Sequence, residues 1–260
     1  MVGGSPEMPG AVILAANAAL RAGAGKLQIA VGRSTSAVVA QAVPEALVAR
    51  LPETKSGGLG AARRVEELAS DADAVLVGPG MDEGPDTARL LRRLVGAMSP
   101  RGILVVDAAA LLPLARDPDA LKKLDGRAIV TPHAGEVASM TGERKEEIER
   151  DPAAWARRCA RTFHGCVALK GAETFVADRS GRVWRNRAGN TGLAISGSGD
   201  TLSGIAAGLA ARGTAPPQAA VWAVALHARA GDRLARRMGP LGFLPRELLA
   251  EIPALMRALS

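Results

Sequence analysis

Aromatic residues are scarce in this sequence, where they make up 2% of 260 residues, and tyrosine is absent. A core must therefore be built from alanine, valine, leucine and isoleucine. Modules that stack nucleic-acid bases on aromatic platforms do not fit this composition. Hydrophobic residues at 48% and charged residues at 23% are ordinary for a folded protein. The length suits one large core, so we expect a single domain over residues 1–260.

Cysteine and long apolar runs are also scarce. The two cysteines, Cys159 and Cys166, lack metal-ligand spacing, and we expect free thiols in a reducing compartment. The longest apolar run, Ala11–Leu20, is broken by Asn17 and is too short to span a bilayer. Residues 1–10 lack the basic start and apolar stretch of a signal peptide. We therefore expect a cytoplasmic protein with no membrane partner.

Charge is biased toward one sign, with a formal net charge of +7. This bias suits anionic partners, among which small phosphorylated ligands count. The arginine pairs nevertheless lie on helix-like segments and are typical of solvated helix faces, and we expect no nucleic-acid partner. These pairs are Arg63-Arg64, Arg92-Arg93 and Arg157-Arg158.

Short apolar strands alternate with helical patterns along the chain. This alternation predicts a three-layer α/β fold, with a mostly parallel sheet covered by helices on both faces. The main predicted strands are Ala74–Val77, Ile103–Val106, Ala128–Val130 and Val167–Leu169. A helix is predicted over Leu59–Ser70, and an edge hairpin over Phe175–Ala177 and Val183–Arg185. From Gly199 onward the pattern is almost entirely helical.

Four stretches that could bind a ligand follow predicted strands directly. They are Gly78-Pro79-Gly80, Asp107, Thr131–Glu136 and Lys170-Gly171. Ligands in such sheets bind beyond the carboxyl ends of the strands, so we expect these stretches on one rim. Taken singly, each has a plain alternative, such as a simple turn or a surface lysine on an edge hairpin. No dinucleotide fingerprint and no Walker lysine motif is present.

The histidines offer few catalytic combinations. His133 could donate a hydrogen bond to a phosphate or carboxamide, and Glu136 either caps the following helix or holds a metal-bound water. For His164 and His227 the sequence indicates no partner that would complete a triad.

The stretch Gly189–Gly204 is rich in glycine and ends in a small-residue helical run. Backbone without Cβ atoms approaches oxygen-rich groups closely, and a helix start stabilises phosphate. Asp200 places a carboxylate there, which could take a proton from a substrate hydroxyl. Alternatively, Ser198 and Asp200 only cap and charge the helix start. From these residues alone, a helix cap and a phosphate site are equally well supported.

Taken together, these motifs resemble the bacterial ADP-dependent NAD(P)H-hydrate dehydratases, which have the ribokinase-like fold. The resemblance covers essentially the whole chain, in the segments Ser5–Gly25, Val77–Gly80, Asp107–Leu111, Thr131–Glu136, Leu169–Thr174 and Gly189–Gly204. It implies dehydration of the S epimer of hydrated NADH or NADPH at the expense of ADP with Mg²⁺, giving NAD(P)H, AMP and phosphate. The alternatives are a kinase of the same fold, acting on a hydroxymethylpyrimidine, thiazole alcohol or sugar, and a nucleotide-binding sensor.

The resemblance also implies roles for particular residues. The hydrated dinucleotide would bind at Ala11, Gly80, His133 and Asp200, with Asp200 as the catalytic base. The adenine nucleotide would bind at Lys170, Gly171, Ala172, Glu173, Thr174 and Gly199. Gly197, Ser198 and Gly199 would form the anion hole for the transferred phosphoryl group. No residue is assigned to a metal.

The chain departs from the family pattern at three places. The first strand is almost missing before Gly3, Ser196 and Ser198 stand where glycine and threonine are typical, and Asp107-Ala108-Ala109 lacks a second acid that the family often has there. We therefore expect a late start or a piece of a longer protein, with an upstream epimerase domain or a separate epimerase as a functional partner. Relatives imply a homo-oligomer, for which Ala219–Leu226 could supply either interface or core. The preference for ADP over ATP, and for NADH-hydrate over NADPH-hydrate, stays open.

Overall fold

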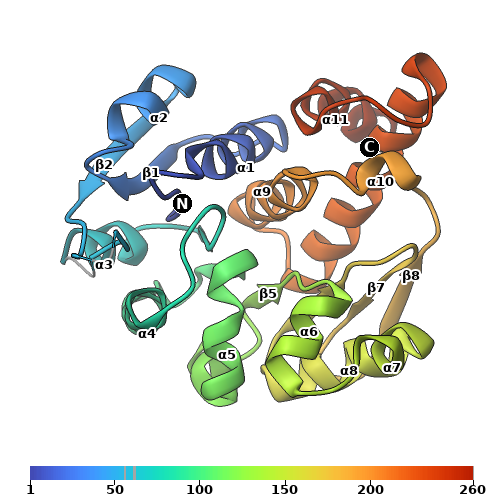
Figure 1. Ribbon diagram of the computed structural model, residues 1–260, viewed down its shortest axis with the longest axis horizontal. Coiled ribbons are helices and arrows are strands. Elements are labelled where there is room, and N and C mark those ends of the chain that lie inside the picture. The colour runs from blue at the N-terminus through green and yellow to red at the C-terminus, as the bar shows by residue number, and fades with distance from the viewer. Residues whose placement is uncertain (56, 61–62, 260) are drawn as a thin grey trace.

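The computed structural model describes residues 1–55, 57–60 and 63–259 (Figure 1). Its strands are β1 (Leu27–Gly32), β2 (Ala46–Leu51), β3 (Ala74–Val77), β4 (Ile103–Val106), β5 (Ala128–Val130), β6 (Cys166–Leu169), β7 (Thr174–Ala177) and β8 (Val183–Asn186). Its α-helices are α1 (Pro9–Arg21), α2 (Ser36–Ala42), α3 (Arg63–Ser70), α4 (Pro85–Ala97), α5 (Leu112–Arg116), α6 (Ala134–Thr141), α7 (Lys145–Arg150), α8 (Pro152–Thr162), α9 (Ser198–Ala211), α10 (Pro216–Met238) and α11 (Pro245–Leu259).

The sheet is mostly parallel, as predicted. Strands β3, β4, β5 and β6 run parallel in that order, and the hairpin β7–β8 continues the sheet antiparallel from β6. Strands β1 and β2 form a separate parallel pair. Val2 joins the two parts, because it bridges Ala30 of β1 and Val77 of β3, both in parallel.

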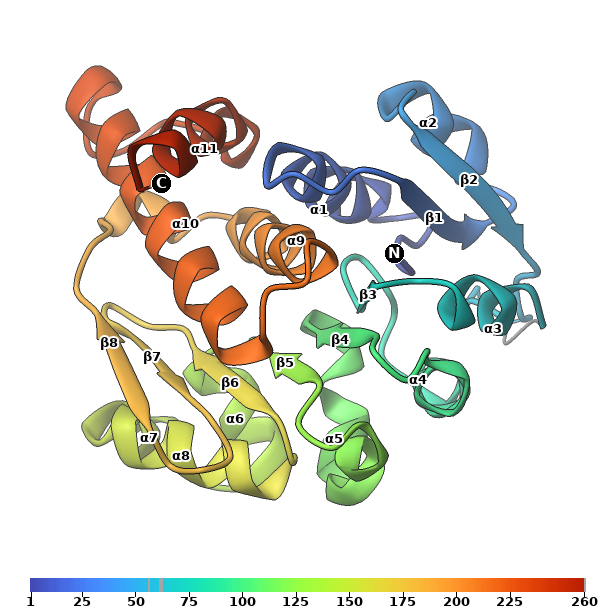
Figure 2. The same cartoon turned by 180° about the vertical axis from the view of Figure 1, so that it is seen from behind.

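Helices cover both faces of the sheet, which gives the three layers that the sequence predicts (Figure 2). Successive residues of a strand point to opposite faces. Val75 and Val77 accordingly belong to the core shared with α3, α4, α5, α6 and α8. Leu76 and Val105 belong to the core shared with α1, α9, α10 and α11.

Small residues bring α1 and α9 into close contact. A Cβ atom on Gly204 would lie 2.2 Å from the carbonyl oxygen of Ala15, and one on Gly208 would lie 2.5 Å from that of Ala19. Close packing of backbone replaces the bulk of aromatic side chains here, in keeping with the composition. This contact holds the start of α9 against the first helix.

Several local predictions need correction. The helix predicted over Leu59–Ser70 begins at Arg63, and Leu59 pairs with Glu53 in an antiparallel bridge; residues 61–62 of that prediction lie outside the described part. Helix α7 was not predicted at all. Of the two roles left open for Ala219–Leu226, core packing is the one seen for five buried residues: Ala219, Ala220, Ala223, Val224 and Leu226.

No helix in the described residues is both long and apolar enough to cross a membrane. A cavity of about 350 Å³ lies between β1 and β3 near Met1, away from the carboxyl ends of the strands.

Candidate active site at the carboxyl ends of the strands

The four suspected stretches meet on one rim of the sheet, which confirms the prediction. Backbone hydrogen bonds join them in order: the Asp107 N–H donates to the Val77 carbonyl at 3.1 Å, and the Thr131 N–H to that of Val106 at 3.2 Å. The Lys170 N–H donates to the Pro132 carbonyl at 2.8 Å. The side chains that follow β4, β5 and β6 therefore start from adjacent positions.

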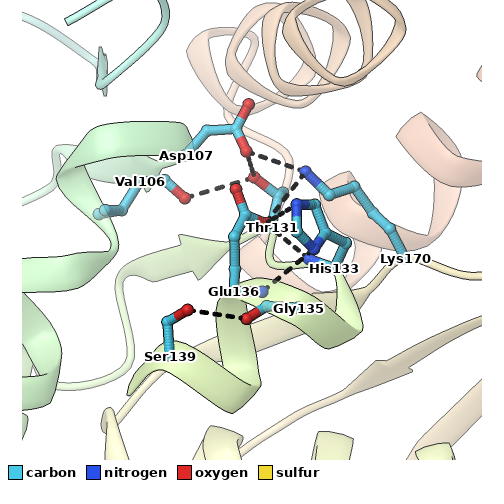
Figure 3. A network of polar contacts seen from close by, with 8 residues as sticks. All are labelled: Val106, Asp107, Thr131, His133, Gly135, Glu136, Ser139 and Lys170. Carbon is cyan, nitrogen blue, oxygen red and sulfur yellow. Dashed lines mark hydrogen bonds and ion pairs between the residues drawn. The ribbon is translucent and has the colours of Figure 1, made fainter. Parts of the chain in front are cut away.

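Lys170 lies inside a cluster of carboxylates (Figure 3). Its Nζ is 3.2 Å from Asp107 Oδ1 and 3.8 Å from the Glu136 carboxylate. Thr131 fixes the same Asp107 oxygen, because its hydroxyl donates to Oδ1 at 2.8 Å. The Lys170 side chain is 20% exposed, so the alternative of a surface lysine on an edge hairpin is wrong. Burial opposes the charge of Lys170, but Asp107 and Glu136 outweigh burial and raise its pKa.

Helix α6 begins with a closed cap. The Glu136 N–H donates to His133 Nδ1 at 3.1 Å, and the His133 N–H donates to the Glu136 carboxylate at 2.7 Å. Of the two roles open for Glu136, the structure shows the cap. The other ring nitrogen of His133, Nε2, lies 3.6 Å from the Glu136 carboxylate, and the His133 side chain is 57% exposed.

Helix α9 begins without a side-chain cap. Gly197 occupies the cap position at φ +90°, and a Cβ atom there would lie 2.6 Å from the Leu14 side chain. In the described residues no hydrogen bond satisfies the backbone N–H groups of Gly199 and Asp200. The interpretation of Ser198 and Asp200 as capping residues is therefore wrong. The helix start presents open donors and the positive end of its dipole.

Lys170 and Asp200 meet at this helix start. A Cβ atom on Gly199 would lie 3.4 Å from Lys170 Nζ, so the ammonium group reaches the first turn of α9. Burial, with repulsion from Asp107, raises the pKa of the Asp200 carboxyl to about 6, and Lys170 opposes this rise. A carboxylate with that pKa is ionised at pH 7 and basic enough to accept a proton.

Ala11 and Gly80 meet at the other side of the rim. A Cβ atom on Gly80, at φ +67°, would lie 3.0 Å from the Ala11 Cβ and 2.3 Å from the Met8 carbonyl oxygen. Only glycine fits this contact between the start of α1 and the loop after β3. Gly80 is buried in this contact, and Ala11 is half-buried.

The segment Lys170–Thr174 divides into two parts. Gly171 and Ala172 are exposed, whereas Glu173 is bound by Arg185, whose Nε and Nη2 donate at 2.6 and 2.7 Å. Thr174 already belongs to β7, where it pairs with Asn186. The Glu173 side chain therefore serves the β7–β8 hairpin, and the backbone of the turn is the part open to a ligand.

Two residues of α10 contact the glycine-rich loop and are not evident from the sequence. His227 Nε2 lies 2.9 Å from the Ser198 hydroxyl, so His227 does have a partner. Asp232 accepts from the backbone N–H of Gly189 at 3.0 Å and from the side chain of Asn190 at 3.1 Å. Nothing in the local pattern of α10 distinguishes these residues, because the contacts depend on how α10 packs beside α9.

The loop tolerates serine at position 196. Among the described non-glycine residues, positive φ is confined to Ala108, Asp125 and His164, so Ser196 avoids the left-handed region. The substitution for the typical glycine therefore adds no backbone strain there.

Comparison with known proteins identifies the family to which the chain belongs. A family model described as NAD(P)H-hydrate dehydratase matches residues 1–254. The chain belongs to the NAD(P)H-hydrate dehydratase family.

Individual dehydratases are similar over the whole chain. The ADP-dependent (S)-NAD(P)H-hydrate dehydratase of Xanthomonas campestris pv. campestris is 45% identical over 257 residues, covering 98% of this chain and 86% of that protein. The bifunctional NAD(P)H-hydrate repair enzyme of Moorella thermoacetica is 39% identical over 261 residues. The match covers 100% of this chain and 49% of the Moorella protein, so the chain spans about half of the bifunctional enzyme.

Solved structures confirm the ribokinase-like fold. The ADP/ATP-dependent NAD(P)H-hydrate dehydratase of Bacillus subtilis, co-crystallized with ATP/Mg²⁺ and soaked with CoA, superposes with a TM-score of 0.79 at 27% identity. The superposition covers 100% of this chain and 90% of the Bacillus subtilis chain. A hydroxyethylthiazole kinase from Pyrococcus horikoshii matches with a TM-score of 0.60 at 17% identity, and that likeness concerns the fold alone.

Proposed function

We propose that this chain dehydrates the S epimer of hydrated NADH or NADPH at the expense of ADP, and releases NAD(P)H, AMP and phosphate. The observation that carries the proposal is the arrangement at the start of α9. There an uncapped helix start, the Lys170 ammonium group and the partly buried Asp200 carboxylate lie together. An anion site beside a base is what phosphoryl transfer to a hydroxyl requires.

Asp200 acts first in the proposed mechanism. Hydroxide leaves the reduced nicotinamide ring poorly, whereas phosphate leaves well. The Asp200 carboxylate takes the proton of the substrate hydroxyl. At the same time, the hydroxyl oxygen of the substrate attacks the β-phosphorus of ADP. The bond from that phosphorus to the bridging oxygen breaks, and AMP departs with the bonding electrons.

Elimination completes the reaction. The bond from the ring carbon to the phosphorylated oxygen breaks, a proton leaves the neighbouring ring carbon, and the dihydropyridine is restored. During the transfer, negative charge builds on the phosphoryl oxygens. The N–H groups of Gly199 and Asp200 and the Lys170 ammonium group stabilise that charge, with Gly197 and Ser198 completing the anion hole.

The two substrates are proposed to bind on either side of Asp200. The hydrated dinucleotide contacts Ala11 and the loop at Gly80, with the exposed ring of His133 beside it. The adenine nucleotide contacts Lys170 and the exposed backbone of Gly171 and Ala172. Glu173 and Thr174 shape that turn through the β7–β8 hairpin.

Magnesium is proposed to arrive with the nucleotide. In the described residues no group of three metal-ligating side chains is close enough to hold an ion. Mg²⁺ is often bound through substrate phosphates rather than a protein cage, and it supplies charge neutralisation there. Proton transfer to Asp200 and charge stabilisation by Lys170 and the α9 N–H groups are carried out by residues of the chain.

One assay tests the proposed function against its alternatives. The protein is incubated with chemically hydrated NADH, ADP and magnesium, and recovery of reduced-nicotinamide absorbance is followed together with AMP release. A dehydratase gives both signals in equal amounts. A kinase for another alcohol gives no absorbance recovery and releases AMP only when that alcohol is added, whereas a sensor gives neither signal under either condition. Either of the last two results would overturn the proposal.

We further propose that residues 1–260 act as one domain in the cytoplasm and assemble as a homo-oligomer. We also propose functional pairing with an NAD(P)H-hydrate epimerase, a pairing that the bifunctional repair enzyme of Moorella thermoacetica supports. Light scattering after gel filtration measures the assembly. Faster turnover of mixed epimers when an epimerase is added measures the pairing.

A further inference from the structure

His227 and Ser198 form a polar contact between two helices that pack side by side. His227 belongs to α10, and Ser198 is the first residue of α9. The imidazole Nε2 lies 2.9 Å from the serine hydroxyl, and Ser198 is buried. The contact lies directly behind the open helix start.

Serine at the cap position usually accepts from the first N–H groups of its own helix, but in α9 Gly197 holds that position and Ser198 is the first helical residue. Here the Ser198 hydroxyl faces His227 instead, and Gly197 caps the helix without a side chain. The N–H groups of Gly199 and Asp200 consequently remain open to an anion. The histidine contact thus fixes the Ser198 side chain next to these open groups.

The imidazole is suited to this contact because it stays neutral. Burial, together with the nearby charge of Lys170, lowers the pKa of His227 to about 4. A neutral ring fixes the hydroxyl without adding a second cation beside Lys170. On the same helix, Asp232 binds the other end of the loop at Gly189 and Asn190. Helix α10 therefore anchors the glycine-rich loop at both ends.

We propose that His227 is a positioning residue, which holds the Ser198 hydroxyl away from the first N–H groups of α9 and so keeps the anion hole open and aligned. This inference rests on the proposed phosphoryl transfer at that site. His227 itself touches neither substrate. It acts through Ser198 alone.

A double-mutant cycle on kcat tests the proposal. His227→Leu removes the ring nitrogens, Ser198→Ala removes the hydroxyl, and the double variant combines both. His227→Leu should lower kcat about tenfold to a hundredfold with the KM for the hydrate within twofold, because it weakens stabilisation of the transition state. In the Ser198→Ala background the same change should lower kcat by less than twofold. His227→Gln, which keeps an amide donor, should recover at least part of the loss.

Two controls separate positioning from folding. Thermal midpoints are compared with that of His164→Asn, a histidine that contacts Asp119 on the surface and should leave kcat unchanged. If His227→Leu does not fold, His227→Asn replaces it in the cycle, because its shorter amide does not reach Ser198. A loss of equal size in both serine backgrounds, or a change in kcat below twofold, would overturn the inference.

Binding of ADP distinguishes failure of this inference from failure of the proposed function. Calorimetric titration of the unaltered protein and of His227→Leu with ADP does not depend on turnover. If the unaltered protein restores no NADH, the proposed function fails, while weaker ADP binding by His227→Leu would still support positioning of the anion hole. If NADH is restored and the cycle shows no coupling, this inference alone fails.

Discussion

Helices α6 and α9 both begin at the rim of the sheet, yet their starts are opposite in chemistry. Each carries an acidic residue at the third helical position, Glu136 in α6 and Asp200 in α9. Glu136 bonds back to the His133 N–H and closes a capping box. Asp200 makes no such bond, because Gly197 caps α9 and leaves its first donors open.

The difference shows that an acid near a helix start does not by itself indicate a role. A carboxylate that bonds to its own backbone stabilises the helix. A carboxylate held off the backbone, beside Lys170 and partly buried, keeps its charge at a cost and stays reactive.

The largest effect is expected from Asp200→Asn. If Asp200 takes the substrate proton, the variant should lose on the order of 10²–10⁴ in kcat, since the amide cannot accept that proton. Initial rates of NADH recovery measure the loss. Glu136→Gln is the matched change at the capped helix, because glutamine also completes a capping box, and it should retain most activity. Near-normal turnover by Asp200→Asn would rule out the base.

A smaller loss is expected from Lys170→Met. Removing the ammonium group at the start of α9 should raise the KM for ADP about tenfold to a hundredfold, the usual range for one hydrogen bond to a charged group. The KM for the hydrate should change much less. Arg179→Met, which breaks a surface ion pair with Asp125, serves as the control. Equal changes in both KM values would contradict a nucleotide role for Lys170.

The pH profile of Asp107→Asn should move in a definite direction. Asp200 must be ionised to accept the proton, so kcat should fall as the pH drops through about 6. Asp107 is one cause of the raised pKa of Asp200, and its neutralisation should shift the acidic limb to lower pH. The amide oxygen of the variant side chain can still accept from Thr131, which preserves local geometry. An unmoved limb would show that the two carboxylates do not interact.

The smallest effects concern stability. Substitution of Glu136 and substitution of Asp200 should change the free energy of unfolding in opposite directions. Glu136→Ala removes one half of the capping box and should lower the free energy of unfolding by about 0.5–1 kcal/mol. Asp200→Ala should raise it by about 1 kcal/mol at pH 7.5, because the folded state disfavours that charge. Since the pKa of Asp200 is raised on folding, this gain should shrink toward zero at pH 4, where the folded protein binds the proton. Urea unfolding of both variants at the two pH values measures the difference, and equal signs at pH 7.5 would contradict the contrast.

Much of the fold could be predicted from the sequence because its signals are local. Polar residues directly after apolar strands predicted which segments meet at the carboxyl ends of the sheet. The turn between β7 and β8 predicted the hairpin that these strands form. The contacts of His227 with Ser198 and of Lys170 with Asp107 could not be predicted. They join elements distant in sequence, and their geometry depends on how whole helices and strands pack. The choice between cap and anion site at α9 depended on the same packing.

The central claim is that the phosphoryl group of ADP passes to the misplaced hydroxyl of the hydrate before that oxygen leaves. Hydrated NADH labelled with ¹⁸O in this hydroxyl tests it directly, with mass analysis of the phosphate released in a single turnover. The mechanism at Asp200 predicts one ¹⁸O atom in each phosphate. Unlabelled phosphate, with the label in water, would contradict it.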